Sequence, residues 1–297
     1  MSEKLMLLVN PCAGKGGSRA ALGDVAEVFC RADWVPTVYM TEQRGDAPRL
    51  TAAYAGEYDR IVCLGGDGTL SETVAGLMSL PEKPILGYIP MGTANDVATT
   101  LGLSRVPVEA ARAILSGTPH PLDVGCMNGV DYFTYIAAFG AFTEVSYETR
   151  QESKQALGLL AYLLEGLSAL PHITPTHARV EWDGGVEEDD YIFCGVTNST
   201  SVAGMVKLDK GFVRLSDGLF EVILVKAPRG IVDMSAIALD ILGQKYQNPN
   251  VRVLHSKKIC FDCDEPVKWT RDGEAGGLHQ HVTLENCHQA IQILLSE

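Results

Sequence analysis

An aspartate set among glycines is the part of this sequence best suited to chemistry. The segment consists of Gly65, Gly66, Asp67, Gly68 and Thr69, and it follows the apolar run 61–64. A buried strand that ends in a glycine-rich turn before a helix points backbone N–H groups at one place, and such a place binds phosphate. Asp67 would repel a phosphate unless a cation lay between them. The simplest such cation is Mg²⁺ carried by a nucleotide.

Two further polar segments follow predicted strands in the same half of the chain. The first, 10–18, reads Asn-Pro-Cys-Ala-Gly-Lys-Gly-Gly-Ser; it departs from the P-loop because glycine follows Lys15, and from the dinucleotide fingerprint because Arg19 replaces the last glycine. An ordinary strand–helix loop explains this segment equally well. The second, 90–96, offers the Thr93 hydroxyl, the Asn95 amide and the Asp96 carboxylate. Either of the last two residues could instead cap a helix.

Alternating strand and helix patterns in residues 1–125 position these segments. Buried strands are predicted at 5–9, 37–40, 61–64, 85–89 and 122–124, and helices at 18–32, 47–54, 69–80 and 108–115. Asp46 is expected to cap the second helix, and Thr69 with Glu72 has the spacing of a capping box for the third. This alternation predicts an α/β domain with a parallel sheet covered on both faces. Ligands of such sheets bind at the carboxyl ends of the strands, where all three segments lie.

Residues 126–297 change to a period-two pattern typical of antiparallel strands. Strands are predicted at 132–138, 178–182, 191–196, 219–225, 257–263 and 290–295, separated by turn signals such as Asn128-Gly129 and Asp272-Gly273. Helical inserts are expected at 154–170 and 231–242. The pattern indicates a mainly β, sandwich-like second domain, from which the last strand could return to the first.

Composition narrows the class of protein. The 297 residues carry a net charge of −13, which argues against unspecific binding to nucleic acid or to anionic membranes. No apolar run approaches the roughly 20 residues that span a bilayer, and no signal peptide is evident, so we expect a cytoplasmic protein. Cys260 and Cys263 would face opposite sides of a strand, which makes a zinc site there a weak interpretation.

Segments 65–69 and 92–96 together resemble the catalytic domain of the diacylglycerol kinase family, and specifically its soluble bacterial lipid kinases. The first segment is shared with NAD kinases and phosphofructokinases, whereas Gly-Thr-Ala-Asn-Asp at 92–96 is more specific. The resemblance extends to 10–11, 122–125, 217–219 and 272–274, and so covers the whole chain. It implies a first domain of the NAD kinase and phosphofructokinase type.

The resemblance also implies a set of site residues. ATP would be bound by Asn10, Gly14, Thr41, Gly65, Gly66, Asp67, Gly68, Thr69, Glu72, Gly92, Thr93 and Asn95. Mg²⁺ would be held through water by Asp67, Asp96 and Asp123, and a second, structural metal by the Asp217 side chain with the carbonyls of Arg214 and Leu219. Glu274 would be the catalytic base, with Asp272 beside it. The chain departs from the family at Ser71, where relatives usually carry asparagine.

These implications describe an ATP- and Mg²⁺-dependent kinase that phosphorylates a hydroxyl of diacylglycerol or a related lipid at a membrane surface. An NAD kinase-like enzyme, or a catalytically silent nucleotide- or lipid-binding protein, is the alternative. A homodimer and peripheral membrane contact are compatible with the sequence. The apolar segment 157–170 could receive acyl chains or pack against the second domain's sheet. Asp272-Gly273-Glu274 also fits a hairpin turn with both carboxylates at an exposed tip.

Overall fold

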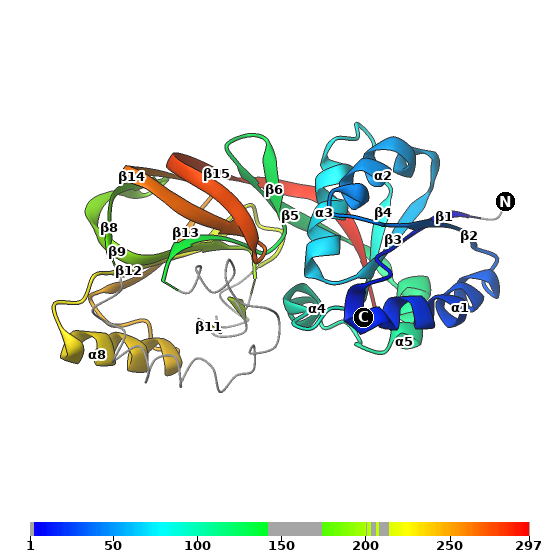
Figure 1. The fold of residues 1–297 in the computed structure, drawn as a ribbon, viewed down its shortest axis with the longest axis horizontal. Helices are drawn as coiled ribbons and strands as arrows, with labels where there is room; N and C mark the ends of the chain where they lie inside the picture. The colour runs from blue at the N-terminus through cyan, green and yellow to red at the C-terminus, as the bar shows by residue number, and fades with distance from the viewer. Residues whose placement is uncertain (1–2, 142–173, 200, 203–205, 208–213, 297) are drawn as a thin grey trace. The chain divides into compact units, whose positions relative to one another are not determined.

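Four parallel strands form the centre of the first part of the chain (Figure 1). They pair in the order β4-β3-β1-β2, and their bounds are β1 (Lys4–Val9), β2 (Val35–Met40), β3 (Arg60–Gly65) and β4 (Ile85–Pro90). The inner three strands are buried because apolar side chains project from both of their faces. The prediction of a buried strand over 37–40 is wrong: β2 is the edge strand, and Val35, Val38 and Met40 are exposed.

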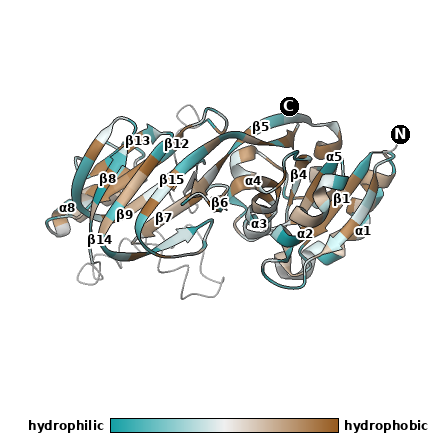
Figure 2. Cartoon of the chain, turned by 90° about the horizontal axis from the view of Figure 1, so that it is seen from above, coloured by the Kyte–Doolittle hydropathy of each residue, from teal (hydrophilic) through white to brown (hydrophobic). Residues whose placement is uncertain are grey.

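Helices cover both faces of this sheet. Their bounds are α1 (Gly17–Cys30), α2 (Asp46–Tyr54), α3 (Asp67–Met78), α4 (Asp96–Leu101) and α5 (Pro107–Ser116), with short 3-10 turns at Ala13–Gly16 and Ala55–Glu57. Figure 1 shows α1 and α5 on one side of the strands and α2 and α3 on the other. Val25 and Phe29 of α1 pack against Leu5 and Leu7 of β1 in a fully buried cluster. Figure 2 shows the matching run of hydrophobic residues along β1 and β4.

The start of α3 differs from the prediction. The helix begins at Asp67 after Gly66, two residues earlier than expected, and no side chain caps it. Thr69 and Glu72 therefore lie inside the helix and form no capping box. Their side chains are left for contacts with neighbouring loops.

A long final strand belongs to both compact units of the chain. By contact density the chain divides into unit 1 (Met1–Val124, Tyr132–Thr134 and Cys287–Glu297) and unit 2 (Gly125–Asp131 and Tyr135–Asn286). The end of β15 (Glu274–Leu295) joins the parallel strands, where Ile293 pairs with Leu86 of β4. The strand predicted over 122–124 is longer, β5 (Thr118–Met127), and it pairs with β15 and β6 (Asp131–Phe133) rather than with the parallel strands.

Unit 2 is built from antiparallel strands. They are β7 (Ile136–Gly140), β8 (Thr176–Trp182), β9 (Gly185–Thr197), β12 (Phe220–Lys226), β13 (Val251–Ser256) and β14 (Lys258–Arg271), with a small pair β10 (Ser201–Val202) and β11 (Val206–Lys207) and the helix α8 (Ile231–Leu242). Both β9 and β14 pair with β8 along one half and with β7 along the other, so each contributes to two layers. The layers enclose Phe139, Phe261 and Trp269, whose ring centroids lie 4.9–5.6 Å apart.

This computed structural model describes residues 3–141, 174–199, 201–202, 206–207 and 214–296. The helix predicted over 154–170, and with it the apolar segment 157–170, lies outside the described residues. Within them, no helix is long and apolar enough to cross a membrane.

Candidate active site

The loops that follow β3 and β4 pack against each other through glycine. The Met91 N–H donates to the Gly65 carbonyl at 2.7 Å. A Cβ atom on Gly92 would lie 2.9 Å from Gly66 Cα, and one on Gly66 would lie 3.2 Å from Gly92 Cα. Only residues without a side chain allow the two backbones to approach so closely. The structure therefore brings the predicted segments 65–69 and 92–96 together.

Asn95 closes the second of these loops. Its Oδ1 accepts the Gly92 N–H at 2.8 Å, and its Nδ2 donates to the Gly92 carbonyl at 2.8 Å. The residue is buried and left-handed, with φ +52°. Both ends of the amide are thus used within the loop, so the capping alternative is wrong for the Asn95 side chain: the residue occupies the cap position of α4 but makes no side-chain cap bond. Thr93, by contrast, is exposed.

Asp67 connects the starts of two helices. It is the first residue of α3, and its carboxylate accepts the N–H groups of Asp96 and Val97, at 3.2 and 3.3 Å, at the start of α4. Negative charge is favourable at both positions because helix N-termini carry partial positive charge. The carboxylate of Asp67 therefore contacts the backbone of Asp96, the second predicted metal residue.

The segment after β1 joins the same place. Asn10 donates from Nδ2 to Thr69 Oγ1 at 3.0 Å and accepts the Cys12 N–H on Oδ1 at 3.0 Å. Gly14 has φ +60°, and a Cβ there would lie 2.6 Å from the Met91 carbonyl oxygen. Because Asn10 Nδ2 can only donate, Thr69 Oγ1 accepts, and the threonine proton is left to donate elsewhere.

Thr41 begins a fourth loop of unit 1, and Glu72 of α3 contacts this loop. The Thr41 N–H donates to the Val9 carbonyl at 2.9 Å, which fixes the residue at the carboxyl end of β2. Glu72 Oε1 accepts the Gly45 N–H at 3.3 Å, so this helix side chain holds the loop that follows Thr41. The prediction that Asp46 caps α2 is wrong: Gly45 is the cap residue, and the Asp46 carboxylate instead accepts two backbone N–H groups of the preceding loop.

The surroundings beneath the loops are apolar. Tyr88 of β4 is buried, which raises the pKa of its phenol far above the usual range, and the Asp67 charge adds to the effect. Burial likewise raises the pKa of the Cys63 thiol to about 12. Both groups are therefore neutral at physiological pH.

Asp123 is the third predicted metal carboxylate. It is fully buried on β5, and its Oδ1 accepts the Gln289 N–H of β15 at 2.6 Å. Among the described residues, no group of three or more His, Cys, Asp or Glu side chains is arranged to hold a metal ion. A protein-only magnesium cage is thus missing from the part of the chain that is described. Mg²⁺ commonly uses one or two carboxylates with substrate phosphates and water instead.

Asp272 and Glu274 lie at the β14–β15 hairpin in unit 2. The expectation that both are exposed is wrong for Asp272, which is buried because its Oδ1 accepts the N–H groups of Tyr135 and Ile136 at 2.9 and 3.0 Å. Asp272 and Gly273 have φ +47° and +80°, as a two-residue hairpin turn requires. Glu274 is exposed.

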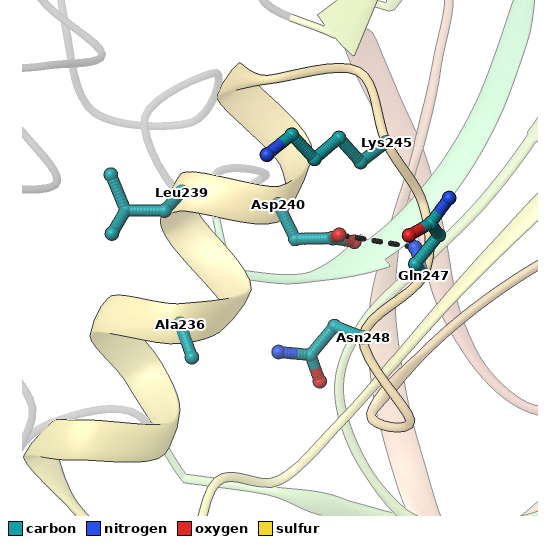
Figure 3. Close-up of a pocket in the computed structure, with 6 residues that line it drawn as sticks. All are labelled: Ala236, Leu239, Asp240, Lys245, Gln247 and Asn248. Carbon is teal, nitrogen blue, oxygen red and sulfur yellow. Dashed lines mark hydrogen bonds between the residues drawn. The ribbon is translucent and has the colours of Figure 1, made fainter.

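Other candidate positions lie elsewhere in unit 2. Asp217 is exposed, and its Oδ1 accepts the Leu219 N–H at 3.0 Å, while Arg214 is exposed nearby in the sequence. A cavity of about 310 Å³ opens beside α8 (Figure 3). Its lining residues are Ala236, Leu239, Asp240, Lys245, Gln247 and Asn248, none of which the sequence had singled out.

Comparison with known proteins agrees with this arrangement. Residues 4–127 match the model of the diacylglycerol kinase catalytic domain, and residues 138–295 match the YegS C-terminal NAD kinase beta sandwich-like domain. The diacylglycerol kinase of Bacillus subtilis (strain 168) is 32% identical over 278 residues, covering 93% of this chain and 91% of the relative. That of Staphylococcus carnosus (strain TM300) is 34% identical over 280 residues, covering 93% and 90%.

A crystal structure of a diacylglycerol kinase from Bacillus anthracis str. Sterne superimposes with a TM-score of 0.77 and 25% identity, covering 99% of this chain and 97% of the solved one. Fold and loops together define a two-domain α/β protein with a kinase catalytic domain and a β-sandwich-like domain. The chain belongs to the diacylglycerol kinase family, so the resemblance drawn from segments 65–69 and 92–96 is confirmed.

Proposed function

We propose that this protein transfers the γ-phosphoryl group of ATP to a hydroxyl of diacylglycerol or a related lipid. The observation that carries the proposal is the convergence of three loops in unit 1. Segments 10–14, 65–69 and 90–96 are joined by the Asn10–Thr69 bond, the Met91–Gly65 bond and the contact of Gly66 with Gly92. Phosphoryl transfer depends mainly on positioning and charge stabilisation, which such loops supply.

The roles of individual residues follow from their contacts. The backbone of Gly65–Gly68 and the Thr69 hydroxyl would donate to ATP phosphates, since the Thr69 proton is not used by Asn10. Asp67 and Asp96 would hold Mg²⁺, which neutralises phosphate charge when bound. Glu274 is the proposed base because it is exposed, whereas the carboxylate of Asp272 is buried against backbone N–H groups. Asp272 would then hold the hairpin that carries Glu274.

The remaining predicted residues belong to the same proposal. Asp123 would support the Mg²⁺ site, and Asp217 with the carbonyls of Arg214 and Leu219 would bind a second, structural metal. A lipid acceptor requires transient contact with a membrane surface. Metal analysis of the purified protein and of Asp217→Ala tests the second site, since the variant should lose one bound metal per chain while unit 1 still binds ATP.

The decisive experiment is transfer of radiolabelled γ-phosphate in the presence of Mg²⁺. Mixed micelles of diacylglycerol, monoacylglycerol, phosphatidylglycerol and sphingosine serve as acceptors, and NAD is tested separately. We expect a labelled lipid, with turnover lost in Glu274→Gln and retained in Glu265→Gln, because Glu265 is an exposed glutamate on β14 of the same hairpin. Label in NADP would support the NAD kinase-like alternative. ATP binding without transfer to any acceptor would support the silent binding protein.

A further inference from the structure

The loop between β2 and α2 carries Thr41, one of the predicted nucleotide residues. Thr41 is buried and anchored by its N–H to the Val9 carbonyl of β1. The four residues that follow, 42–45, must turn the chain back before α2 begins at Asp46. What holds this turn decides where Thr41 lies.

Asp46 holds the turn from the inside. Its side chain is nearly buried, with 5% of the residue exposed. Oδ2 accepts the N–H groups of Glu42 and Gln43 at 2.9 and 3.0 Å, and Oδ1 accepts from the Arg49 guanidinium at 2.9 Å. These bonds, with Arg49 the largest contributor, lower the pKa of the carboxyl to about 2. The Asp46 carboxylate is therefore ionised at neutral pH and holds the backbone of the turn through these bonds. It does not cap α2, because Gly45 occupies the cap position.

A second carboxylate attaches the turn to α3. Glu72 of α3 accepts the Gly45 N–H at 3.3 Å, and Gly45 has φ +83°, which a residue with a side chain seldom adopts. The first turn of the same helix contains Asp67 and Thr69. The position of Thr41 therefore depends on α3, the helix that begins within segment 65–69.

We propose that Asp46 is a positioning residue for the nucleotide, which sets the Thr41 loop against α3 without itself contacting ATP. The role rests on the proposed function. Removal of a carboxylate that only stabilised the fold would lower stability and would affect the binding of both substrates alike. Removal of a carboxylate that positions the Thr41 loop must weaken ATP binding selectively, because Thr41 is a predicted nucleotide residue.

The test compares Asp46→Ala with Asp46→Asn and with the control Asp24→Ala, which removes an exposed carboxylate from α1. KM for ATP, KM for lipid, kcat and binding of a fluorescent ATP analogue are measured at a temperature where circular dichroism shows each variant folded. We expect Asp46→Ala to raise the KM and the Kd for nucleotide at least tenfold, with lipid KM within twofold of wild type. Asp46→Asn keeps an acceptor for the two N–H groups but loses the charge facing Arg49, so it should lie between. Asp24→Ala should match wild type.

Two results separate failure of this role from failure of the proposed function. An unchanged KM for ATP in folded Asp46→Ala, or parallel changes for both substrates, overturns the positioning role alone. A wild-type chain that binds no ATP overturns the proposed function and the role together. If Asp46→Ala fails to fold, Asp46→Asn decides the question, with a three- to tenfold rise in KM for ATP expected and no rise overturning the role.

Discussion

Adding one methyl group at Gly92 tests whether the contact between the two loops matters. In Gly92→Ala the new Cβ would lie 2.7 Å from Asn95 Oδ1 and 2.9 Å from Gly66 Cα, both closer than real Cβ contacts. Asn95 is itself held by two bonds to Gly92, so it cannot swing aside without breaking one. Overpacking of this kind costs about 1–3 kcal/mol. A lost hydrogen bond adds about 1 kcal/mol.

The expected result is therefore a free energy of unfolding lowered by about 2–4 kcal/mol, because the backbones must separate or Asn95 must move. Loops that separate also hold phosphate less well, and about 1.4 kcal/mol of lost binding corresponds to tenfold in Kd. We expect the Kd for ATP to rise between ten- and a hundredfold, measured by nucleotide titration alongside urea unfolding. The matched control is Gly23→Ala, where a Cβ on α1 meets nothing within 4 Å. That change should stabilise the protein by about 0.5–1 kcal/mol and leave ATP binding unchanged. A Gly92→Ala protein with wild-type stability and wild-type ATP affinity would refute the close contact.

Three further outcomes follow from burial and charge. Asp272→Ala should lower the free energy of unfolding by about 1–3 kcal/mol for each backbone N–H left unsatisfied, and Asp272→Asn by less, as denaturant melts can show. Because Asp46 has a folded pKa of about 2 and an unfolded one of about 3.9, its stabilising contribution is present above pH 4 and is lost as the pH falls toward 2. Acid melts of Asp46→Asn should lack this component; an identical acid transition in both proteins would contradict it. In native protein at pH 8, iodoacetamide should modify exposed Cys12 and Cys30 and spare buried Cys63, whose thiol pKa is about 12; mass spectrometry that finds Cys63 labelled equally would contradict this.

The positions of most strands and helices could be predicted because periodicity and chain punctuation are local. The helix at 231–242 matches α8, and the glycine turn at 272–273 lies where the signal predicted it. The edge position of β2 could not be predicted, since the apolar content of residues 35–40 reads like an inner strand. Its exposure is set by strand order, which is a property of the whole sheet.

The identity of the loops that meet was also predictable, because parallel strands place their carboxyl ends at one edge. Residue type could not reveal how each polar side chain is used there. Asn10 and Asn95 are equally plausible nucleotide ligands by sequence. The Asn95 side chain, however, bonds to Gly92 of its own loop through both ends of its amide, whereas Asn10 reaches Thr69 on another element.

The roles of the aspartates likewise could not be predicted from residue type. Asp46, Asp67, Asp123 and Asp272 all accept backbone N–H groups; the donors to Asp46 lie in the adjoining loop, and those to the other three lie on a different element. A carboxylate held in this way is kept in one orientation, because moving it would leave N–H groups unsatisfied in a buried place. That cost applies whether the free side of the carboxylate faces a cation or more protein. Both kinds of substitution should therefore lower stability, and a loss of nucleotide affinity in the folded variant is the property that would distinguish a proposed ligand such as Asp67 from a structural carboxylate such as Asp272.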